Sequence, residues 1–135
     1  LKMSRLSWLE YGMHLAATAS LRSEDPYVQV GCCILRPDNS IASLGYNGAP
    51  PGVDIDWSNR DDRRKRVIHA ETNALRFIKP GEGDRMFVTL MPCSDCLKNA
   101  ASYGINKIFY NKVYDFDTSA KDLAQEFRIT LQQIT

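Results

Sequence analysis

One histidine, one glutamate and two cysteines in this chain have the spacing of a catalytic metal site. His69 and Glu71 stand two residues apart, and Cys93 and Cys96 follow about two dozen residues later, directly after Pro92. Zinc binds nitrogen and sulfur ligands in tetrahedral geometry, and a catalytic zinc keeps one of its positions open for water. His69, Cys93 and Cys96 would supply three ligands, which leaves the Glu71 carboxylate to transfer protons.

The same spacing predicts how the backbone presents these groups. Cys93 and Cys96 are three residues apart, so they share one face of a helix that Pro92 can begin. A helix N-terminus carries orphan N–H groups and positive partial charge, which favour thiolate over thiol. His69 and Glu71 would diverge inside a helix, so they can converge on a metal only from the first turn of their own helix. We therefore expect two helix N-termini to meet at one zinc ion.

A C-x-x-C pair by itself is also compatible with a structural zinc half-site or a redox pair. A structural zinc needs a fourth protein ligand, and the candidates are Cys32, Cys33 and His14. Cys32 and Cys33 lie in an apolar run typical of a buried strand, and His14 lies on an amphipathic helix without a partner at ligand spacing. The catalytic interpretation is favoured because H-x-E followed by P-C-x-x-C is the known signature of zinc-dependent nucleobase deaminases.

Composition narrows the class of protein. The chain has 135 residues and a formal net charge of +1, so it can form one domain with a hydrophobic core, and no global charge indicates a nucleic-acid partner. Four cysteines, two of them assigned to zinc, are typical of a reducing compartment. No apolar run approaches membrane-spanning length and no signal peptide is visible. We expect a single domain over residues 1–135, located in the cytoplasm, with no membrane partner.

Hydrophobic periodicity and turn residues predict the elements that carry these groups. Helices are expected over residues 4–21, 70–79, 94–103 and 119–127. Strands are expected over residues 28–36, 41–46, 86–90, 107–110 and 129–132, with a loop at 47–59 and a short charged stretch at 61–66. This order predicts an α/β fold, a three-layer α-β-α sandwich with a central mixed five-stranded sheet. The site would lie where the strand at 86–90 runs into the helix that follows.

Several further stretches resemble the cytidine and deoxycytidylate deaminase superfamily, and within it the deoxycytidylate (dCMP) deaminases. They are residues 22–26 with 29–31, residues 45–48 with Pro50, Gly52 and Asp54, residues 69–74, and Tyr114 and Asp115 with Asp117. The resemblance implies a cytidine deaminase-like fold and the hydrolysis of dCMP to dUMP and ammonia, which supplies dUMP for thymidylate synthesis. Zinc would lower the pKa of water toward about 7 and Glu71 would move the protons.

The resemblance also implies contacts with a small-molecule nucleotide substrate. Asn47 would hold the sugar 3′-hydroxyl, and the backbone of Ala70 would contact the base. Arg22, Ser23 and Tyr114 are the candidates for the 5′-phosphate. Ordinary structural roles stay open, since an arginine can complement a helix C-terminus, an Asn-Gly pair can form a turn and a tyrosine can pack with its hydroxyl in water.

Regulation is implied by the same resemblance. dCMP deaminases are typically hexamers activated by dCTP and inhibited by dTTP, so we expect a homo-oligomer with an effector site at Gly48, Asn73 and Phe77. Mg²⁺ could accompany a bound effector triphosphate. Residues 60–66 form a basic cluster that is either a solvated charged loop or a triphosphate contact. Some family members carry a second metal site ahead of the catalytic histidine, but residues 48–68 contain no cysteine or histidine, so we expect one zinc per chain.

Other functions remain open from the sequence. A related deaminase could act on free cytidine, on adenosine in tRNA or on cytosine in single-stranded DNA. Polynucleotide binding needs a positively charged groove and exposed aromatic side chains, and the near-neutral charge argues against it. A zinc-stabilised interaction module without chemistry would need four protein ligands and would give Glu71 no role.

Overall fold

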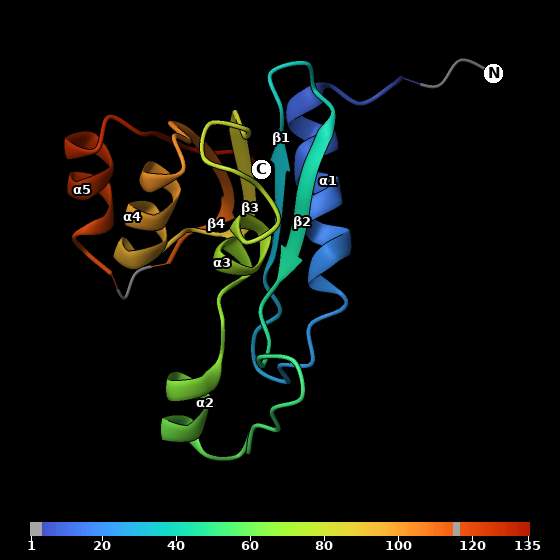
Figure 1. The fold of residues 1–135 in the computed structure, drawn as a ribbon. Coiled ribbons are helices and arrows are strands. Elements are labelled where there is room, and N and C mark those ends of the chain that lie inside the picture. Colours follow the sequence, from blue (N-terminus) through green and yellow to red (C-terminus); the bar gives the residue numbers. More distant parts are fainter. Residues whose placement is uncertain (1–3, 115–116) are drawn as a thin grey trace.

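The computed structural model describes residues 4–114 and 117–135 (Figure 1). Its strands are β1 (Gly31–Leu35), β2 (Ile41–Tyr46), β3 (Arg85–Leu90), β4 (Lys107–Lys112) and β5 (Thr130–Gln133). They form one sheet in the order β2-β1-β3-β4-β5. β1 pairs antiparallel with β2 and β3, whereas β4 pairs parallel with β3 and β5. The predicted mixed five-stranded sheet is confirmed.

Helices cover both faces of this sheet. The helices are α1 (Trp8–Ser20), α2 (Arg60–Arg66), α3 (Ala70–Leu75), α4 (Ser94–Ser102) and α5 (Ala120–Glu126). All but α2 contribute to the core beside the sheet, whereas α2 has no buried residue and lies away from the sheet (Figure 1). Alternate strand residues face opposite sides: Cys33 and Phe87 pack with α1, whereas Cys32 and Val88 pack with α3, α4 and α5. Figure 1 accordingly shows α1 on one side of the sheet and α3 to α5 on the other, which confirms the three-layer sandwich. None of the helices in the described part of the chain is long and apolar enough to cross a membrane.

Local side-chain hydrogen bonds set several element boundaries differently from the predictions. α1 begins at Trp8, because Ser7 and Glu10 form a capping box in which each side chain accepts from the other's backbone N–H, at 3.2 and 2.9 Å. The first strand was expected over 28–36 but begins at Gly31. The N–H of Val30 bonds to the side-chain oxygen of Asn47 instead of joining a strand ladder.

The second and third helices also differ from expectation. The charged stretch at 61–66 is a helix, because Asn59 caps it by accepting from the backbone of Asp62 at 3.1 Å and Asp62 pairs with Arg66 one turn later. The helix expected over 70–79 ends at Leu75. Pro80 disfavours helical geometry in the residue before it, and the chain from 76 onward forms turns instead.

Glycines bring two helices unusually close to the sheet. A Cβ placed on Gly31 would lie 1.8 Å from the carbonyl oxygen of Ala16 in α1. A Cβ on Gly45 would lie 2.5 Å from the backbone nitrogen of Ala74 in α3. Because α3 begins directly after His69, the contact at Gly45 sets how close the histidine motif stands to the sheet.

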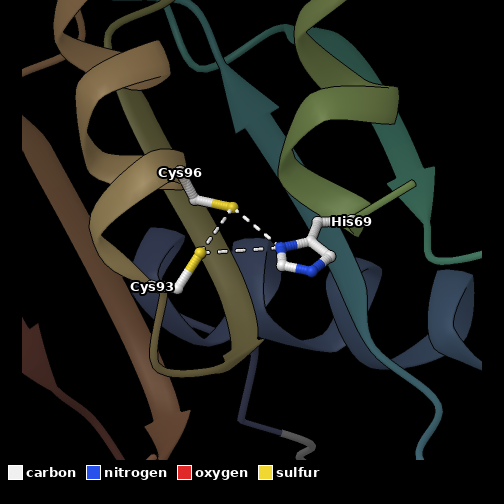
Figure 2. A group of neighbouring side chains, drawn as sticks. All are labelled: His69, Cys93 and Cys96. Atoms are coloured by element: carbon white, nitrogen blue, oxygen red, sulfur yellow. Dashed lines mark hydrogen bonds between the residues drawn. The ribbon is translucent and has the colours of Figure 1, made fainter. Parts of the chain in front are cut away.

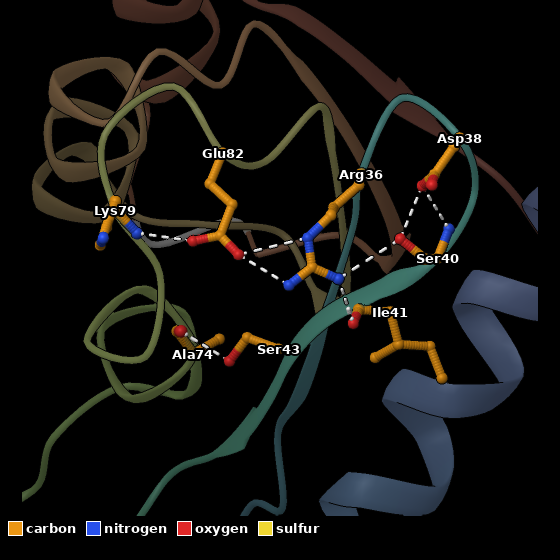
Figure 3. A network of polar contacts seen from close by, with 8 residues as sticks. All are labelled: Arg36, Asp38, Ser40, Ile41, Ser43, Ala74, Lys79 and Glu82. Carbon is orange, nitrogen blue, oxygen red and sulfur yellow. Dashed lines mark hydrogen bonds and ion pairs between the residues drawn. The ribbon is translucent and has the colours of Figure 1, made fainter.

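A polar network ties the far end of α3 to the β1–β2 hairpin (Figure 3). Ser43 in β2 donates its hydroxyl to the carbonyl oxygen of Ala74 at 2.7 Å. Arg36, just after β1, pairs with Glu82 at 2.7 Å and donates to the carbonyl oxygen of Ile41 at 2.8 Å. The hairpin therefore anchors α3 through hydrogen bonds as well as through close packing.

Candidate active site

The three predicted metal ligands lie where two helices begin (Figure 2). His69 is the N-cap residue of α3, Cys93 is the N-cap residue of α4, and Cys96 lies in the first turn of α4. Neither His69 nor Cys93 uses its side chain to cap its own helix. Both side chains are therefore directed into the space between the two N-termini, as the spacing predicted.

The donor atoms form a compact triangle. His69 Nδ1 lies 3.2 Å from Cys96 Sγ and 3.6 Å from Cys93 Sγ, and the two sulfur atoms are 3.5 Å apart. Tetrahedral zinc with ordinary Zn–N and Zn–S bonds would separate such ligands by roughly 3.6–3.8 Å. Among residues 4–114 and 117–135, this is the group of metal-binding side chains that the structure assembles. Three protein ligands fit a catalytic zinc, whose fourth position belongs to water.

The two thiols differ in acidity in a way that suits metal binding. Hydrogen bonds, first from the Cys96 thiol and then from His69, lower the pKa of Cys93 to about 4. The Cys96 thiol donates its hydrogen to Cys93, and this hydrogen bond raises the pKa of Cys96 above the ordinary thiol value. The hydrogen bond with Cys93 also raises the pKa of His69. Cys93 is thus a thiolate at neutral pH, and a bound cation would take the place of the proton that Cys96 and His69 share with it.

Glu71 stands beside this triangle without belonging to it. It lies in the first turn of α3 and is only 4% exposed. Burial raises the pKa of its carboxyl group, which brings it closer to the range in which a carboxyl group can both accept and release a proton during a reaction. The first turn of α3 thus presents His69 and Glu71 to the same space, although they are two residues apart in sequence.

A cavity of about 190 Å³ opens from the metal ligands. His69, Glu71 and Cys93 line one end of it. Asp25, Val28, Val30, Asn47, Val67, Ala70, Leu90, Met91 and Tyr114 line the rest. The structure therefore brings Asn47, Ala70 and Tyr114, three of the predicted substrate contacts, to the same cavity as His69 and Cys93.

Ser23 and Arg22 are placed differently from the other predicted substrate contacts. Ser23 is buried, donates its hydroxyl to the carbonyl oxygen of Asn47 at 2.8 Å and accepts from the backbone of Asp25 at 3.3 Å. It supports the loop behind the cavity and is not among the residues that line it. Arg22 lines a second cavity.

The second cavity has a volume of about 590 Å³ and lies along β2 and α3. It contains all three residues predicted for an effector site, Gly48, Asn73 and Phe77. Arg22 and Arg76 add two guanidinium groups to its lining. The Asn73 side chain donates to the carbonyl oxygen of Tyr46 at 2.8 Å, which ties the α3 side of this cavity to the β2 side.

Some residues of the site were not predicted from the sequence. Val30, Val67, Leu90 and Met91 give the first cavity apolar walls, and no motif distinguishes them from core residues. Asp25 also lines the cavity and is 8% exposed. It lies in the stretch 22–26 that resembles the family, but it was not singled out as a site residue. Of the segment after β4, Asp115 lies outside the described residues.

Asp117, from that same segment, supports the start of α4. Its carboxylate accepts from the backbone N–H and the hydroxyl of Ser94, both at 2.7 Å. The other carboxylate oxygen accepts from the backbone N–H and hydroxyl of Ser119. Because Ser94 follows Cys93 directly, Asp117 holds the helix turn that carries both cysteine ligands.

Comparison with known proteins gives a consistent result. Residues 6–112 match the cytidine and deoxycytidylate deaminase zinc-binding region. The chain is 34% identical to the deoxycytidylate deaminase of Mus musculus over 144 residues, covering 96% of this chain and 81% of the mouse protein. It is also 34% identical to ComE operon protein 2 of Bacillus subtilis, with the match covering 98% of this chain and 74% of the Bacillus protein. The crystal structure of dCMP deaminase from the cyanophage S-TIM5 in apo form superposes with a TM-score of 0.77 at 27% identity, covering 93% of this chain and 96% of the other.

Proposed function

The chain belongs to the cytidine and deoxycytidylate deaminase family, and from that membership we propose that it hydrolyses dCMP to dUMP and ammonia. The observation that carries the proposal is the triangle of His69, Cys93 and Cys96 beside the buried carboxyl of Glu71. Relatives named deoxycytidylate deaminase, similar over most of the chain, point to dCMP among the possible substrates. The dUMP formed would supply thymidylate synthesis.

His69, Cys93 and Cys96 would hold one zinc ion, and their donor set and spacing fit that ion. When bound, zinc supplies a water molecule whose pKa is lowered toward about 7. One carboxylate oxygen of Glu71 takes a proton from the attacking water and delivers it to N3 of cytosine. The water oxygen bonds to C4, and Glu71 then passes the second proton to the departing amino group, which leaves as ammonia.

The remaining lining residues would bind and orient the nucleotide. Val30 and Val67 provide apolar surfaces against which the base can pack and from which water is excluded. We retain Ala70 as the backbone contact to the base and Tyr114 as a candidate phosphate contact, since each lines the cavity. Asn47 also lines the cavity and would lie near the sugar, but both of its amide hydrogens are donated to protein acceptors. Arg22 is better placed for the second cavity than for the substrate phosphate.

A substrate panel tests the proposed reaction. Ammonia release is measured with dCMP, CMP, dCTP, deoxycytidine, cytidine and a deoxycytidine oligonucleotide. A site that holds a charged phosphate is left with unpaired polar groups when the phosphate is missing. We expect dCMP to have the highest kcat/KM. Equal or higher kcat/KM with a free nucleoside or the oligonucleotide would contradict the proposed substrate.

We also propose that the second cavity binds an effector deoxynucleoside triphosphate, with dCTP activating and dTTP inhibiting. Support comes from its two guanidinium groups and the exposed aromatic ring of Phe77, which suit phosphates and a base. Mg²⁺ would accompany the triphosphate. The neighbouring β2 strand could transmit the effect, because Asn47 directly follows it. We further propose that residues 1–135 act as one cytoplasmic catalytic domain within a homo-oligomer, a hexamer on the family pattern.

A further inference from the structure

The lining of the active-site cavity includes a buried acidic side chain, Asp25, which is not one of the metal ligands. Its side chain lines the cavity, and the residue is 8% exposed. Asp25 Oδ1 accepts from the backbone N–H groups of Tyr27 and Val28, at 2.8 and 3.2 Å. In the described part of the chain, Oδ2 receives one long contact, from Asn47 Nδ2 at 3.4 Å. One carboxylate oxygen is therefore used by the loop, while the other keeps acceptor capacity at the cavity.

The amide group of Asn47 is already committed to the protein. Its oxygen accepts from the backbone of Val30 at 2.9 Å. Its nitrogen donates to the carbonyl oxygen of Val28 at 3.0 Å and to Asp25. An amide nitrogen has two hydrogens to donate, and both have acceptors here. Asn47 is thus fixed in one orientation in which it holds the Asp25 side chain at the cavity.

The chemistry of a cytosine nucleotide determines which part can face Asp25. Hydrolysis requires C4 of the base to lie beside Glu71 and the metal ligands. The sugar is attached at N1, on the opposite side of the six-membered ring from C4, so it faces away from the metal and meets the other lining residues of the cavity, whose polar side chains include Asp25 and Asn47. A carboxylate repels a phosphate and accepts a hydrogen bond from a hydroxyl group. In a deoxynucleoside 5′-monophosphate, the 3′-hydroxyl is the sole hydroxyl on the sugar.

We propose that Asp25 Oδ2 accepts a hydrogen bond from the substrate's 3′-hydroxyl, and that Asp25 thereby selects mononucleotides over polynucleotides. This inference rests on the proposed function. Within a polynucleotide the 3′-oxygen carries a phosphodiester, which cannot donate a hydrogen bond and would place a negative charge against the buried carboxylate. Asp25 would therefore be a substrate-binding residue that excludes internal cytosines of a DNA strand.

The first test uses the wild-type protein and changes only the substrate. kcat/KM is compared for dCMP, its 3′-deoxy analogue and its 3′-fluoro analogue. Fluorine has nearly the size of a hydroxyl but has no hydrogen to donate. We expect both analogues to lose about tenfold to hundredfold in kcat/KM, as for one hydrogen bond to a charged acceptor. Either analogue remaining within roughly threefold of dCMP would overturn the inference, because the site would not be accepting a hydrogen bond.

The second test adds the variant Asp25→Asn. Its amide oxygen can still accept from Tyr27 and Val28, but its nitrogen replaces Oδ2 with a donor. For this variant, we expect the ratio of kcat/KM for dCMP to kcat/KM for the 3′-deoxy analogue to fall toward one. We also expect kcat/KM for the dinucleotide pdCpdT to rise relative to that for dCMP. Asp38→Asn is the matched control, because Asp38 forms a similar two-residue turn with Ser40 outside the cavity, and it should keep the wild-type ratio. If Asp25 only supports the loop, the substitution would lower kcat/KM for all substrates together and leave the ratio unchanged. That result would overturn the inference.

The two proposals fail in distinguishable ways. A wild-type protein without dCMP turnover would contradict the proposed function and this inference with it. Turnover of dCMP with unchanged efficiency on the 3′-deoxy and 3′-fluoro analogues would overturn the role of Asp25 alone. The analogue series requires no variant, so it can overturn the inference even if Asp25→Asn does not fold.

Discussion

Identical residue types have different chemistry in this protein because their surroundings differ. Burial raises the pKa of Cys33 to about 12, and it also raises that of Cys32, so both stay as thiols in the core. Hydrogen bonds at the start of α4 lower the pKa of Cys93 to about 4. Among the four cysteines, Cys93 is therefore the thiol whose surroundings favour the thiolate at neutral pH, and Cys96 stands beside it as the hydrogen-bond donor. The position of each pair, in mid-strand or at a helix start, decides this difference.

Replacement of Glu71 tests the proton-transfer role. Glu71→Gln keeps the shape of the side chain and can form hydrogen bonds, but it cannot carry a proton between water and the base. We expect turnover of dCMP to fall by about 10²- to 10⁴-fold while the zinc content stays unchanged. Steady-state kinetics and metal analysis provide the measurements. Glu126→Gln, on the exposed surface of α5, is the matched control and should behave as wild type. Near-normal turnover by Glu71→Gln would remove this residue from the mechanism.

At the scale of elements, the site depends on where α3 and α4 begin. The sequence predicted both helix starts because proline, the cysteine spacing and the histidine motif are local signals. The helix α2 was not predicted, because its sequence has no apolar periodicity. The Asn59 cap and the Asp62–Arg66 ion pair stabilise it instead. β1 was predicted too long because Val28 and Val30 are apolar and β-branched, whereas their N–H groups bond to Asp25 and Asn47. The first of these bonds is a local turn and the second joins residues 17 apart in sequence, and hydrophobic periodicity reveals neither.

The close approach of α3 to β2 gives a prediction for Gly45. In Gly45→Ala, the new methyl group would lie 2.5 Å from the backbone of Ala74 and 2.6 Å from the carbonyl oxygen of Ala70. Backbone atoms cannot move aside as a flexible side chain can, so α3 must shift and carry His69 and Glu71 with it. We expect a loss of roughly 1–3 kcal/mol in the free energy of unfolding together with reduced dCMP turnover.

Denaturant unfolding and kinetics measure the two effects of Gly45→Ala. Gly48→Ala is the control for stability, because a Cβ there would have its nearest contact at 3.8 Å. A Gly45→Ala protein as stable and active as wild type would contradict the role assigned to this contact.

The support of α4 by Asp117 gives a prediction that depends on pH. Hydrogen bonds from Ser94, and then from Ser119, lower the pKa of Asp117 from 3.8 to about 2. The folded-state pKa is depressed, so the stabilisation is complete above about pH 4 and is lost as the pH falls toward about 2. Asp117→Ala should therefore cost about 1 kcal/mol in the free energy of unfolding at neutral pH, as for a lost helix cap.

This difference between wild type and Asp117→Ala should shrink below about pH 4. Urea unfolding at several pH values measures it. Asp54→Ala, in the exposed loop before α2, provides the control for loss of a surface carboxylate and should keep the wild-type stability at neutral pH. A difference that stays constant down to pH 2 would mean that Asp117 contributes by packing and not by its charge.

At the scale of the whole molecule, the segment from Gly45 to Asn47 contributes to the lining of both cavities. Asn47 lines the first cavity, while Gly45 and Tyr46 line the second. The layer arrangement, the sheet and the zinc ligands could be predicted from the sequence, since they follow from periodicity and short motifs. The separation of Arg22 from the substrate cavity could not, because it depends on how the turn after α1 packs against β2 and α3.

Phe77 tests whether the second cavity is regulatory. It is 63% exposed, and the guanidinium group of Arg76 lies 4.7 Å from its ring centre. In wild type, dCTP and dTTP should shift the apparent affinity for dCMP by about 5- to 150-fold, the usual range of allosteric coupling. Phe77→Ala should reduce this shift while leaving kcat without effectors near the wild-type value. Saturation curves with and without each triphosphate, alongside light scattering for the oligomeric state, measure the response. Hyperbolic dCMP saturation curves that do not change when either triphosphate is added would contradict the regulatory proposal but not the zinc chemistry.

The most direct test of the central claim is a zinc titration of metal-free protein, with dUMP formation from dCMP as the readout. Activity should be absent without metal, rise linearly with added zinc and reach its maximum at one zinc per chain, because three ligands form one site. Cys93→Ala should fail to recover activity, since two remaining ligands hold zinc poorly. Cys33→Ala, which removes a buried thiol on the α1 side of the sheet, should titrate as wild type does. Full dCMP turnover by the metal-free protein, or by Cys93→Ala, would contradict the account.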